Sequence, residues 1–238
     1  MNRPEFQGFT EEALQFLEQV RENDSKTWYE ENKPRYEKLL LDPFKQLVSG
    51  LAPDLLLIDP LFEVTPSVNK TISRLYRDTR FSKDKSLYRS TMWFTFKRPK
   101  ADWLEAPSFF FEISPLSFRY GMGYYSANRE SMDIFRAKVL ANLDVFYKTI
   151  QPMSDGDRYE IEGDKYKRSL HPDLPSELKE WIDRKNLYLV HNSTDIQRLF
   201  SSVIADELLT GFKQLEPIYH YLCKVEEQKM ASSVVNRS

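Results

Sequence analysis

The feature that most constrains the fold is a series of three strand-like runs in the middle of the chain, at residues 91–96, 107–114 and 117–125. These runs are rich in β-branched and aromatic side chains, which favour strands. The gaps between them are short for the helical crossover that a parallel pair needs, and Pro115 lies in the second gap. The pattern therefore predicts a central, mainly antiparallel sheet.

Helical patterns precede these strands. Residues 11–22 follow a capping Thr10 and carry one apolar face, as expected of an amphipathic helix. Further helix starts are expected after the Asn-Asp-Ser triplet at 23–25, at Pro34 in the first turn of a continuation to residue 41, and at the cap-then-proline pair Asp42-Pro43. The first quarter of the chain is therefore predicted to be helical.

Helices and short strands alternate after residue 125. We expect a long helix from Asn128 or Ser131 to residue 150, a strand at 159–162, a helix at 175–185, a strand at 187–190, and closing helices at 195–229 that Pro217 kinks or splits. The sequence contains no repeat and no long linker. It therefore predicts one α+β domain over residues 1–230, with N-terminal and C-terminal helices flanking the sheet, and a disordered tail at 231–238.

The composition is that of a globular chain. Apolar residues make up 41% of the 238 residues and aromatic residues 14%, which is enough for a core. The net charge of −2 argues against a whole surface that coats nucleic acid or membrane, and no apolar run approaches the roughly 18 residues of a membrane span. Cys223 is the one cysteine, and no signal peptide follows Met1, so we expect a reduced, cytoplasmic protein.

Positive charge is concentrated in one stretch, residues 67–100, which we call the basic segment. It holds ten lysines and arginines against Asp78 and Asp84, so its net charge is +8 and the rest of the chain sums to −10. A basic island in an acidic body indicates a site for an anion.

The cations of the basic segment have a spacing that favours convergence on one ligand. Arg74, Arg77 and Arg80 recur at every third residue, and guanidinium groups bind phosphate or carboxylate through two hydrogen bonds. The candidate ligand-binding residues are Arg74, Arg77, Asp78, Arg80, Lys83, Asp84, Lys85, Tyr88 and Tyr124, with the aspartates orienting the cations and the tyrosines as lining. Alternatively, Asp78 and Asp84 pair with these cations only to fasten a loop, and the two roles are compatible.

Familiar catalytic motifs are absent or incomplete. Ser82 and Lys85 have the Ser-x-x-Lys spacing of penicillin-recognising enzymes, but the companion motifs are missing. Gly121-Met-Gly123 lacks the third glycine of a dinucleotide fingerprint, and a bulge or a close backbone approach is the better interpretation. The three histidines, His171, His191 and His220, have no metal-ligand spacing. We therefore predict no cofactor and no metal, and we assign no catalytic residue.

The run from Arg77 to Lys85, Arg-Asp-Thr-Arg-Phe-Ser-Lys-Asp-Lys, resembles the core of a bacterial family catalogued as domain of unknown function 2461. The similarity extends to Phe6-x-Gly-Phe9, residues 23–29 with Trp28, Tyr36, Gly121-Met-Gly123, Lys167-Arg168, Gly211-Phe212 and Pro217. The chain departs from the family pattern at Leu87, where proline is usual, and at Arg89, where lysine is usual. The resemblance implies a single α+β domain and brings no activity with it.

Three functional hypotheses follow from the basic segment. The favoured one is a pocket for a phosphate-bearing or other anionic small molecule, in a protein that is either a binder or an enzyme acting on that molecule. The second is a module whose basic face binds nucleic acid or an acidic protein. The third is a purely structural network of ion pairs. The sequence leaves the oligomeric state open.

Overall fold

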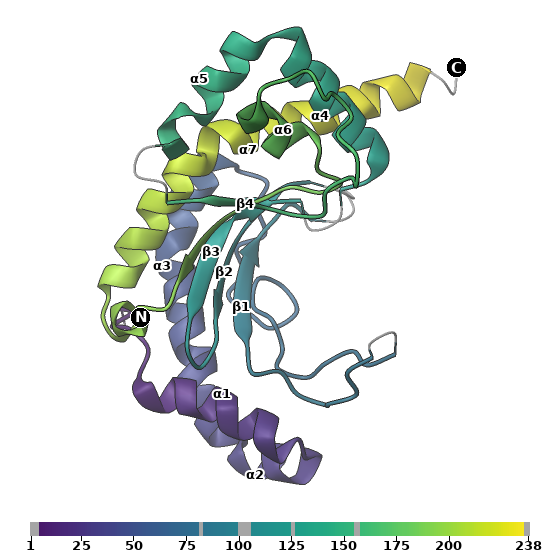
Figure 1. Ribbon diagram of the computed structural model, residues 1–238. Coiled ribbons are helices and arrows are strands. Elements are labelled where there is room, and N and C mark those ends of the chain that lie inside the picture. Colours follow the sequence, from purple (N-terminus) through teal and green to yellow (C-terminus); the bar gives the residue numbers. More distant parts are fainter. Residues whose placement is uncertain (1–4, 81–82, 100–105, 125–126, 155–157, 236–238) are drawn as a thin grey trace. The chain divides into compact units, whose positions relative to one another are not determined.

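The computed structural model of the chain describes residues 5–80, 83–99, 106–124, 127–154 and 158–235. The fold is α+β, as the sequence predicts (Figure 1). The chain forms two compact units. The first comprises Met1–Phe96, Phe110–Tyr120 and Asn192–Thr210, and the second comprises Lys97–Phe109, Gly121–His191 and Gly211–Ser238.

Five strands form one antiparallel sheet in the order β1-β2-β3-β5-β4. The predicted central strands are present as β1 (Met92–Phe96), β2 (Ser108–Ile113) and β3 (Phe118–Gly123), and the later ones as β4 (Glu160–Glu162) and β5 (Tyr188–Ser193). In β1 alternate side chains are buried, which follows from the two-residue period of a strand. The strand and sheet predictions are confirmed.

In the first unit, helix α1 (Glu11–Asn23) begins as predicted, because the Thr10 hydroxyl accepts a hydrogen bond from the Ala13 N–H at 3.2 Å. Ser25 caps α2 (Lys26–Tyr36) in the same way through the Trp28 N–H. The two helices contact each other through the Phe16 and Trp28 rings, whose centroids lie 5.6 Å apart.

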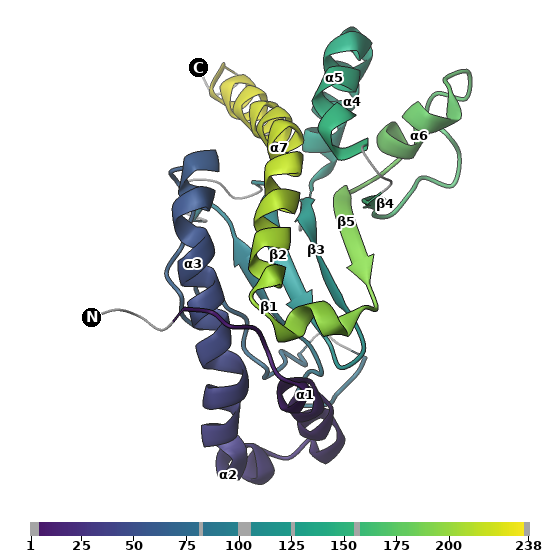
Figure 2. The same cartoon turned by 90° about the vertical axis from the view of Figure 1, so that its left-hand side faces the viewer.

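A five-residue π-helix, η1 (Glu37–Leu41), joins α2 to α3 (Asp42–Ile58) without a loop (Figure 2). The prediction of a separate cap at Asp42 is wrong, because Asp42 is itself helical and its N–H bonds to the Glu37 carbonyl five residues back. The prediction for Pro34 is also wrong, since it lies inside α2. The next residue, Pro43, lacks an N–H, and a widened turn before it avoids the regular bonding pattern that proline would break.

The core of the first unit is aromatic. The Phe44 ring of α3 lies 5.1 Å from Phe9, 6.4 Å from Phe94 of β1 and 6.2 Å from Phe111 of β2, measured between centroids. Phe94 and Phe111 are themselves 5.5 Å apart. These contacts pack α3 against the buried face of β1 and β2, and so fix the two ends of the segment that joins α3 to β1.

In the second unit the predicted long helix is two helices, α4 (Arg129–Ala141) and α5 (Leu143–Ser154). The break is at Asn142, whose backbone leaves the helical region and whose side-chain oxygen accepts a hydrogen bond from the Val145 N–H. An asparagine that caps the next helix competes with helix continuation. Helix α6 (Ser176–Ile182) follows Pro175, as predicted, but ends three residues early.

The chain closes with a 3-10 helix, η2 (Ile196–Phe200), and the long helix α7 (Val203–Val235), which contains Pro217. Residues 231–235, expected in a disordered tail, continue α7, and 236–238 lie outside the described residues. In the second unit α7 packs its Phe212 and Tyr219 rings against Phe109, each with centroids 5.1 Å away. No helix within the described ranges is long and apolar enough to cross a membrane.

Gly121 and Gly123 serve a close approach between strands, as the sequence analysis proposed. A Cβ atom on Gly121 would overlap the Leu189 carbonyl oxygen, and one on Gly123 would overlap the Leu187 carbonyl oxygen. The glycines therefore allow β3 and the chain at β5 to lie against each other.

Candidate functional site

The segment between α3 and β1 forms a hairpin that projects from the first unit (Figure 1). Its arms are residues 71–77 and 87–95, and its tip is residues 78–86; we call the whole the arginine hairpin. The Arg77 N–H donates to the Leu87 carbonyl at 2.7 Å, and the Arg89 N–H donates to the Leu75 carbonyl at 3.0 Å. Sequence reasoning missed this pairing, because apolar and polar residues do not alternate regularly along the two arms.

An aspartate at the end of α1 anchors the second arm. Asp24 follows the last turn of α1 in the left-handed conformation, with φ 39° and ψ 37°. Its carboxylate accepts hydrogen bonds from the backbone N–H groups of Leu87 at 2.7 Å and Tyr88 at 3.0 Å. Sequence reasoning took Asp24 only as part of a helix stop, and no local signal connects it with residues 63 positions later.

Asp84 ties the tip to two arginines. Its carboxylate lies 2.9 Å from Nη1 of Arg77 and 3.1 Å from Nη2 of Arg21 on α1. The Ser86 hydroxyl and backbone N–H also donate to it, at 2.6 and 3.0 Å. These Ser86 hydrogen bonds first, and then the charges of Arg21 and Arg77, lower the pKa of Asp84 to about 2. Arg21 is a member of this cluster that sequence reasoning did not find.

Asp78 makes a local pair with Arg80. The Arg80 guanidinium donates to both carboxylate oxygens, with Nη2 at 2.7 Å and Nε at 3.0 Å, and the Arg80 backbone N–H adds a third bond. Hydrogen bonds from Arg80, aided by the charge of Arg74, lower the pKa of Asp78 to about 2. The Arg80 side chain is nevertheless 77% exposed, so its outer surface faces solvent.

Three further cations of the hairpin, Arg74, Lys83 and Lys85, are exposed. Lys85 donates from Nζ to the Thr79 carbonyl at 2.9 Å, an acceptor without a negative charge. Arg74 and Lys83 are exposed, and among the residues that the structure describes neither side chain forms an ion pair. Ser82, the other half of the weak Ser-x-x-Lys match, lies outside the described residues.

Tyr88, a predicted lining residue, lies on the second arm of the hairpin and is buried, with 2% of its surface exposed. Its ring stacks on Tyr29 of α2 with centroids 4.8 Å apart, and the Tyr76 ring meets it edge-on at 5.8 Å. Burial, followed by the neighbouring Tyr88 and acidic side chains, raises the pKa of Tyr29 to about 12. The tyrosines therefore form a neutral, packed base for the charged tip.

Tyr124, the other predicted lining residue, belongs to the second unit. It is 1% exposed, and its hydroxyl donates to the Leu222 carbonyl of α7 at 3.1 Å. Its surroundings in that unit are those of a core residue.

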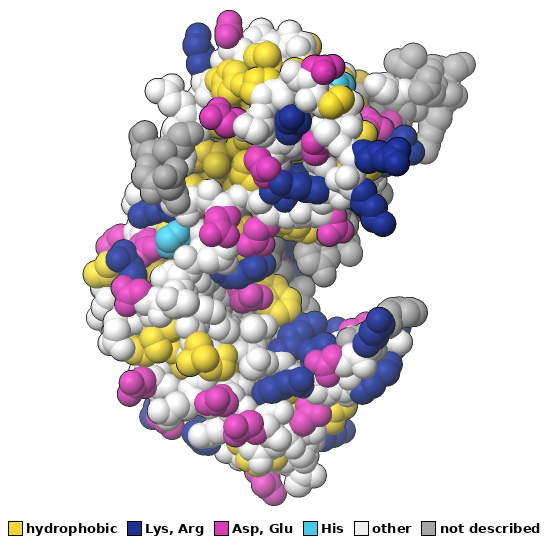
Figure 3. Space-filling view, in the orientation of Figure 1, with side chains coloured by type: hydrophobic (Ala, Val, Ile, Leu, Met, Phe, Trp, Pro, Cys, Tyr) yellow, Lys and Arg dark blue, Asp and Glu magenta, His cyan; other side chains and the backbone are white. Residues whose placement is uncertain are grey.

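The charge arrangement limits the chemistry of this surface, where blue and magenta side chains interleave (Figure 3). Asp78 and Asp84 are ionised at neutral pH, so neither supplies a proton as a general acid. No group of three histidine, cysteine, aspartate or glutamate side chains within the described ranges could hold a metal ion. The hairpin is suited to binding negative charge.

Fold and site together define an α+β protein that presents an arginine-rich hairpin fastened to its first helix by aspartates. Residues 12–221 match the family described as a conserved hypothetical protein, DUF2461, and the chain belongs to that family. The match confirms the resemblance found in the sequence. Comparison with curated proteins and with solved structures found no match in either set.

Proposed function

We propose that the protein binds a phosphate-bearing or other anionic small molecule through the exposed cations of the arginine hairpin. The residues that would contact it are Arg74, Arg80, Lys83 and Lys85. The observation that carries the proposal is a division of roles within the hairpin. Asp84 pairs with Arg77 and with Arg21 of α1 and so holds the tip in place, whereas these four cations are exposed.

The balance of charge supports the same assignment. Residues 71–95 contain six lysines and arginines and two aspartates, a net charge of +4. Even with both aspartates paired to cations, the hairpin therefore keeps a net positive charge. The ion pairs of Asp84 and the hydrogen bonds of Asp24 already hold the described part of the hairpin in one arrangement, and a site arranged before binding loses less conformational entropy when it binds.

A second candidate, binding of nucleic acid, is favoured by the exposure of the tip. Arg80 is exposed over most of its surface, and Arg74, Lys83 and Lys85 are exposed along a projecting hairpin. Such cations suit the repeated phosphates of a polyanion as well as a single anion.

The deciding experiment is calorimetric titration of wild type and of the double variant Arg74→Ala, Lys83→Ala with inorganic phosphate, sugar phosphates, nucleotides and dicarboxylates. Neither side chain forms an ion pair in the described structure, so the variant should unfold at the wild-type temperature and bind at least tenfold more weakly. Lys224→Ala, which removes one exposed charge from α7 in the second unit, is the control and should bind normally. If no anion binds wild type, or if the control weakens binding equally, the proposal is wrong.

Salt dependence separates the two candidates. Binding to a nucleic acid falls steeply with the logarithm of salt concentration, because each phosphate contact releases counterions. A single small anion has few such contacts and gives a shallow slope. Two results together would establish the second candidate in place of the first. The affinity would fall steeply with salt, and several single cation substitutions would each weaken binding by a similar amount.

A further inference from the structure

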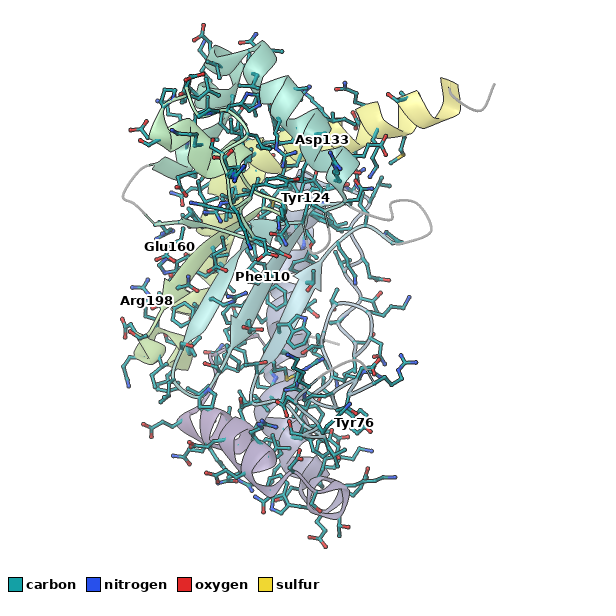
Figure 4. The ribbon with its side chains drawn as sticks, turned by 45° about the vertical axis from the view of Figure 1, so that its right-hand side comes forward. Tyr76, Phe110, Tyr124, Asp133, Glu160 and Arg198 are labelled. Carbon is teal, nitrogen blue, oxygen red and sulfur yellow. The ribbon has the colours of Figure 1, made fainter. Side chains whose placement is uncertain are left out.

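The exposed face of the arginine hairpin includes one aromatic ring among its charges. Tyr76 is 48% exposed. The residues two positions away on either side, Arg74 on the first arm and Asp78 at the start of the tip, are exposed too, whereas Leu75, between Arg74 and Tyr76, is buried. Residues two apart in an extended chain share a face and lie roughly 7 Å from each other. Figure 4 shows Tyr76 on this projecting segment, where nitrogen-tipped side chains gather.

The Tyr76 ring is held by a neighbouring ring on the same face of the hairpin. Tyr76 and Tyr88 oppose each other across the two arms, and the bonds Arg77 N–H to Leu87 and Arg89 N–H to Leu75 flank them. This is the non-hydrogen-bonded type of antiparallel pair, in which the side chains lie on one face and closest together. The buried Tyr88 ring, itself stacked on Tyr29, therefore supports Tyr76 edge-on at 5.8 Å.

We infer that the ligand of the hairpin is a nucleotide, whose base stacks on Tyr76 while its phosphate binds the neighbouring cations. Every nucleobase has a flat face that stacks on an aromatic side chain, and a ring that is already immobile loses little entropy on stacking. The spacing of alternate residues places Arg74 on one side of the ring, with the Asp78–Arg80 pair on the other. The inference rests on the proposed function and narrows its ligand class.

The test compares ligands that share a phosphate and differ in the base. Calorimetry would measure adenosine monophosphate, ribose 5-phosphate and inorganic phosphate on wild type, Tyr76→Phe and Tyr76→Leu. Wild type and Tyr76→Phe should prefer the nucleotide over ribose phosphate by roughly tenfold, within the range that base stacking contributes. Tyr76→Leu should bind both alike, with its affinity for ribose phosphate unchanged. Tyr147→Leu, at an exposed tyrosine of α5 in the second unit, is the control and should keep the preference.

The possible results separate this inference from the proposed function. If phosphate and ribose phosphate bind but the base adds nothing, or if Tyr76→Leu weakens all three ligands equally, the nucleotide assignment is wrong and the anion site remains. If none of the phosphates binds, the proposed function itself fails. A parallel titration with short single-stranded oligonucleotides distinguishes the source: affinity that rises with length indicates a strand, and affinity equal to that of the monomer indicates a free nucleotide.

Discussion

Asp24 should stabilise the protein through a contact far from it in sequence, and its substitutions test this directly. Its carboxylate is the acceptor for the backbone N–H groups of Leu87 and Tyr88. Asp24→Gly removes both bonds and tolerates the left-handed backbone, whereas Asp24→Ala removes them and also places a Cβ in that conformation. Asp24→Asn keeps a neutral oxygen acceptor at the same position and is tolerated in the left-handed region.

The expected losses can be worked from these contacts. Two hydrogen bonds at a half-buried site contribute about 1 kcal/mol each, so Asp24→Gly should lower the free energy of unfolding by about 2 kcal/mol. Asp24→Ala should lose about 1 kcal/mol more through backbone strain. At roughly 2–4 °C per kcal/mol for a chain of this size, the midpoints should fall by roughly 4–8 °C for glycine and 6–12 °C for alanine. The midpoint of Asp24→Asn should fall least.

Circular dichroism measures the unfolding midpoints, and amide hydrogen exchange shows which part of the chain is destabilised. In Asp24→Gly the amides of α3 should lose protection only as far as the global free energy of unfolding falls, whereas the amides of Leu87 and Tyr88 should lose more, because their own hydrogen bonds are removed. The reasoning is refuted if Asp24→Gly unfolds at the wild-type temperature, or if it is destabilised while these two amides keep their protection.

Four other outcomes follow from the structure. The lowered pKa of Asp84 means that its contribution to stability is present above about pH 4 and is lost as pH falls towards 2, a dependence that Asp84→Asn should abolish in acid unfolding. The raised pKa of Tyr29 means that stability should fall above about pH 10, less so in Tyr29→Phe, as alkaline unfolding would show. Gly121→Ala should expose unfolded chain to limited proteolysis, because its Cβ overlaps the Leu189 carbonyl. Cys223, 3% exposed, should react with thiol reagents only at the rate of unfolding.

Most of the fold could be predicted from local signals. The caps at Thr10 and Ser25 and the β-branched runs act within a few residues, so their effect is visible in the sequence. The break at Asn142 was missed because an asparagine inside an apolar stripe is only a weak interruption, and its role depends on the side chain turning to cap α5. Asp42-Pro43 does open α3, but the separate cap expected there was wrong because the sequence does not show that a π-helix leads directly into this helix.

The site was predictable in part. The density of positive charge located the hairpin. The sequence left open whether its two aspartates pair with its cations, and in the structure Asp78 pairs with Arg80 and Asp84 with Arg77. The sequence does not show that Arg21 of α1 is the partner of the tip, because no local pattern distinguishes this residue. Nothing local separates Tyr88, which is buried, from Tyr76, which is exposed, because both occupy Leu-Tyr-Arg triplets.

The two contacts that fasten the hairpin to α1, Arg21 to Asp84 and Asp24 to Leu87, each join residues 63 positions apart. Forming them requires closure of a long stretch of chain, whose entropy must be overcome before the contacts can stabilise the tip. The tip should therefore take its shape late in folding, after α1 and α3 are in place. A chain with a damaged N-terminal helix would carry the same charges without their arrangement, so anion binding would report whether the first unit has folded correctly.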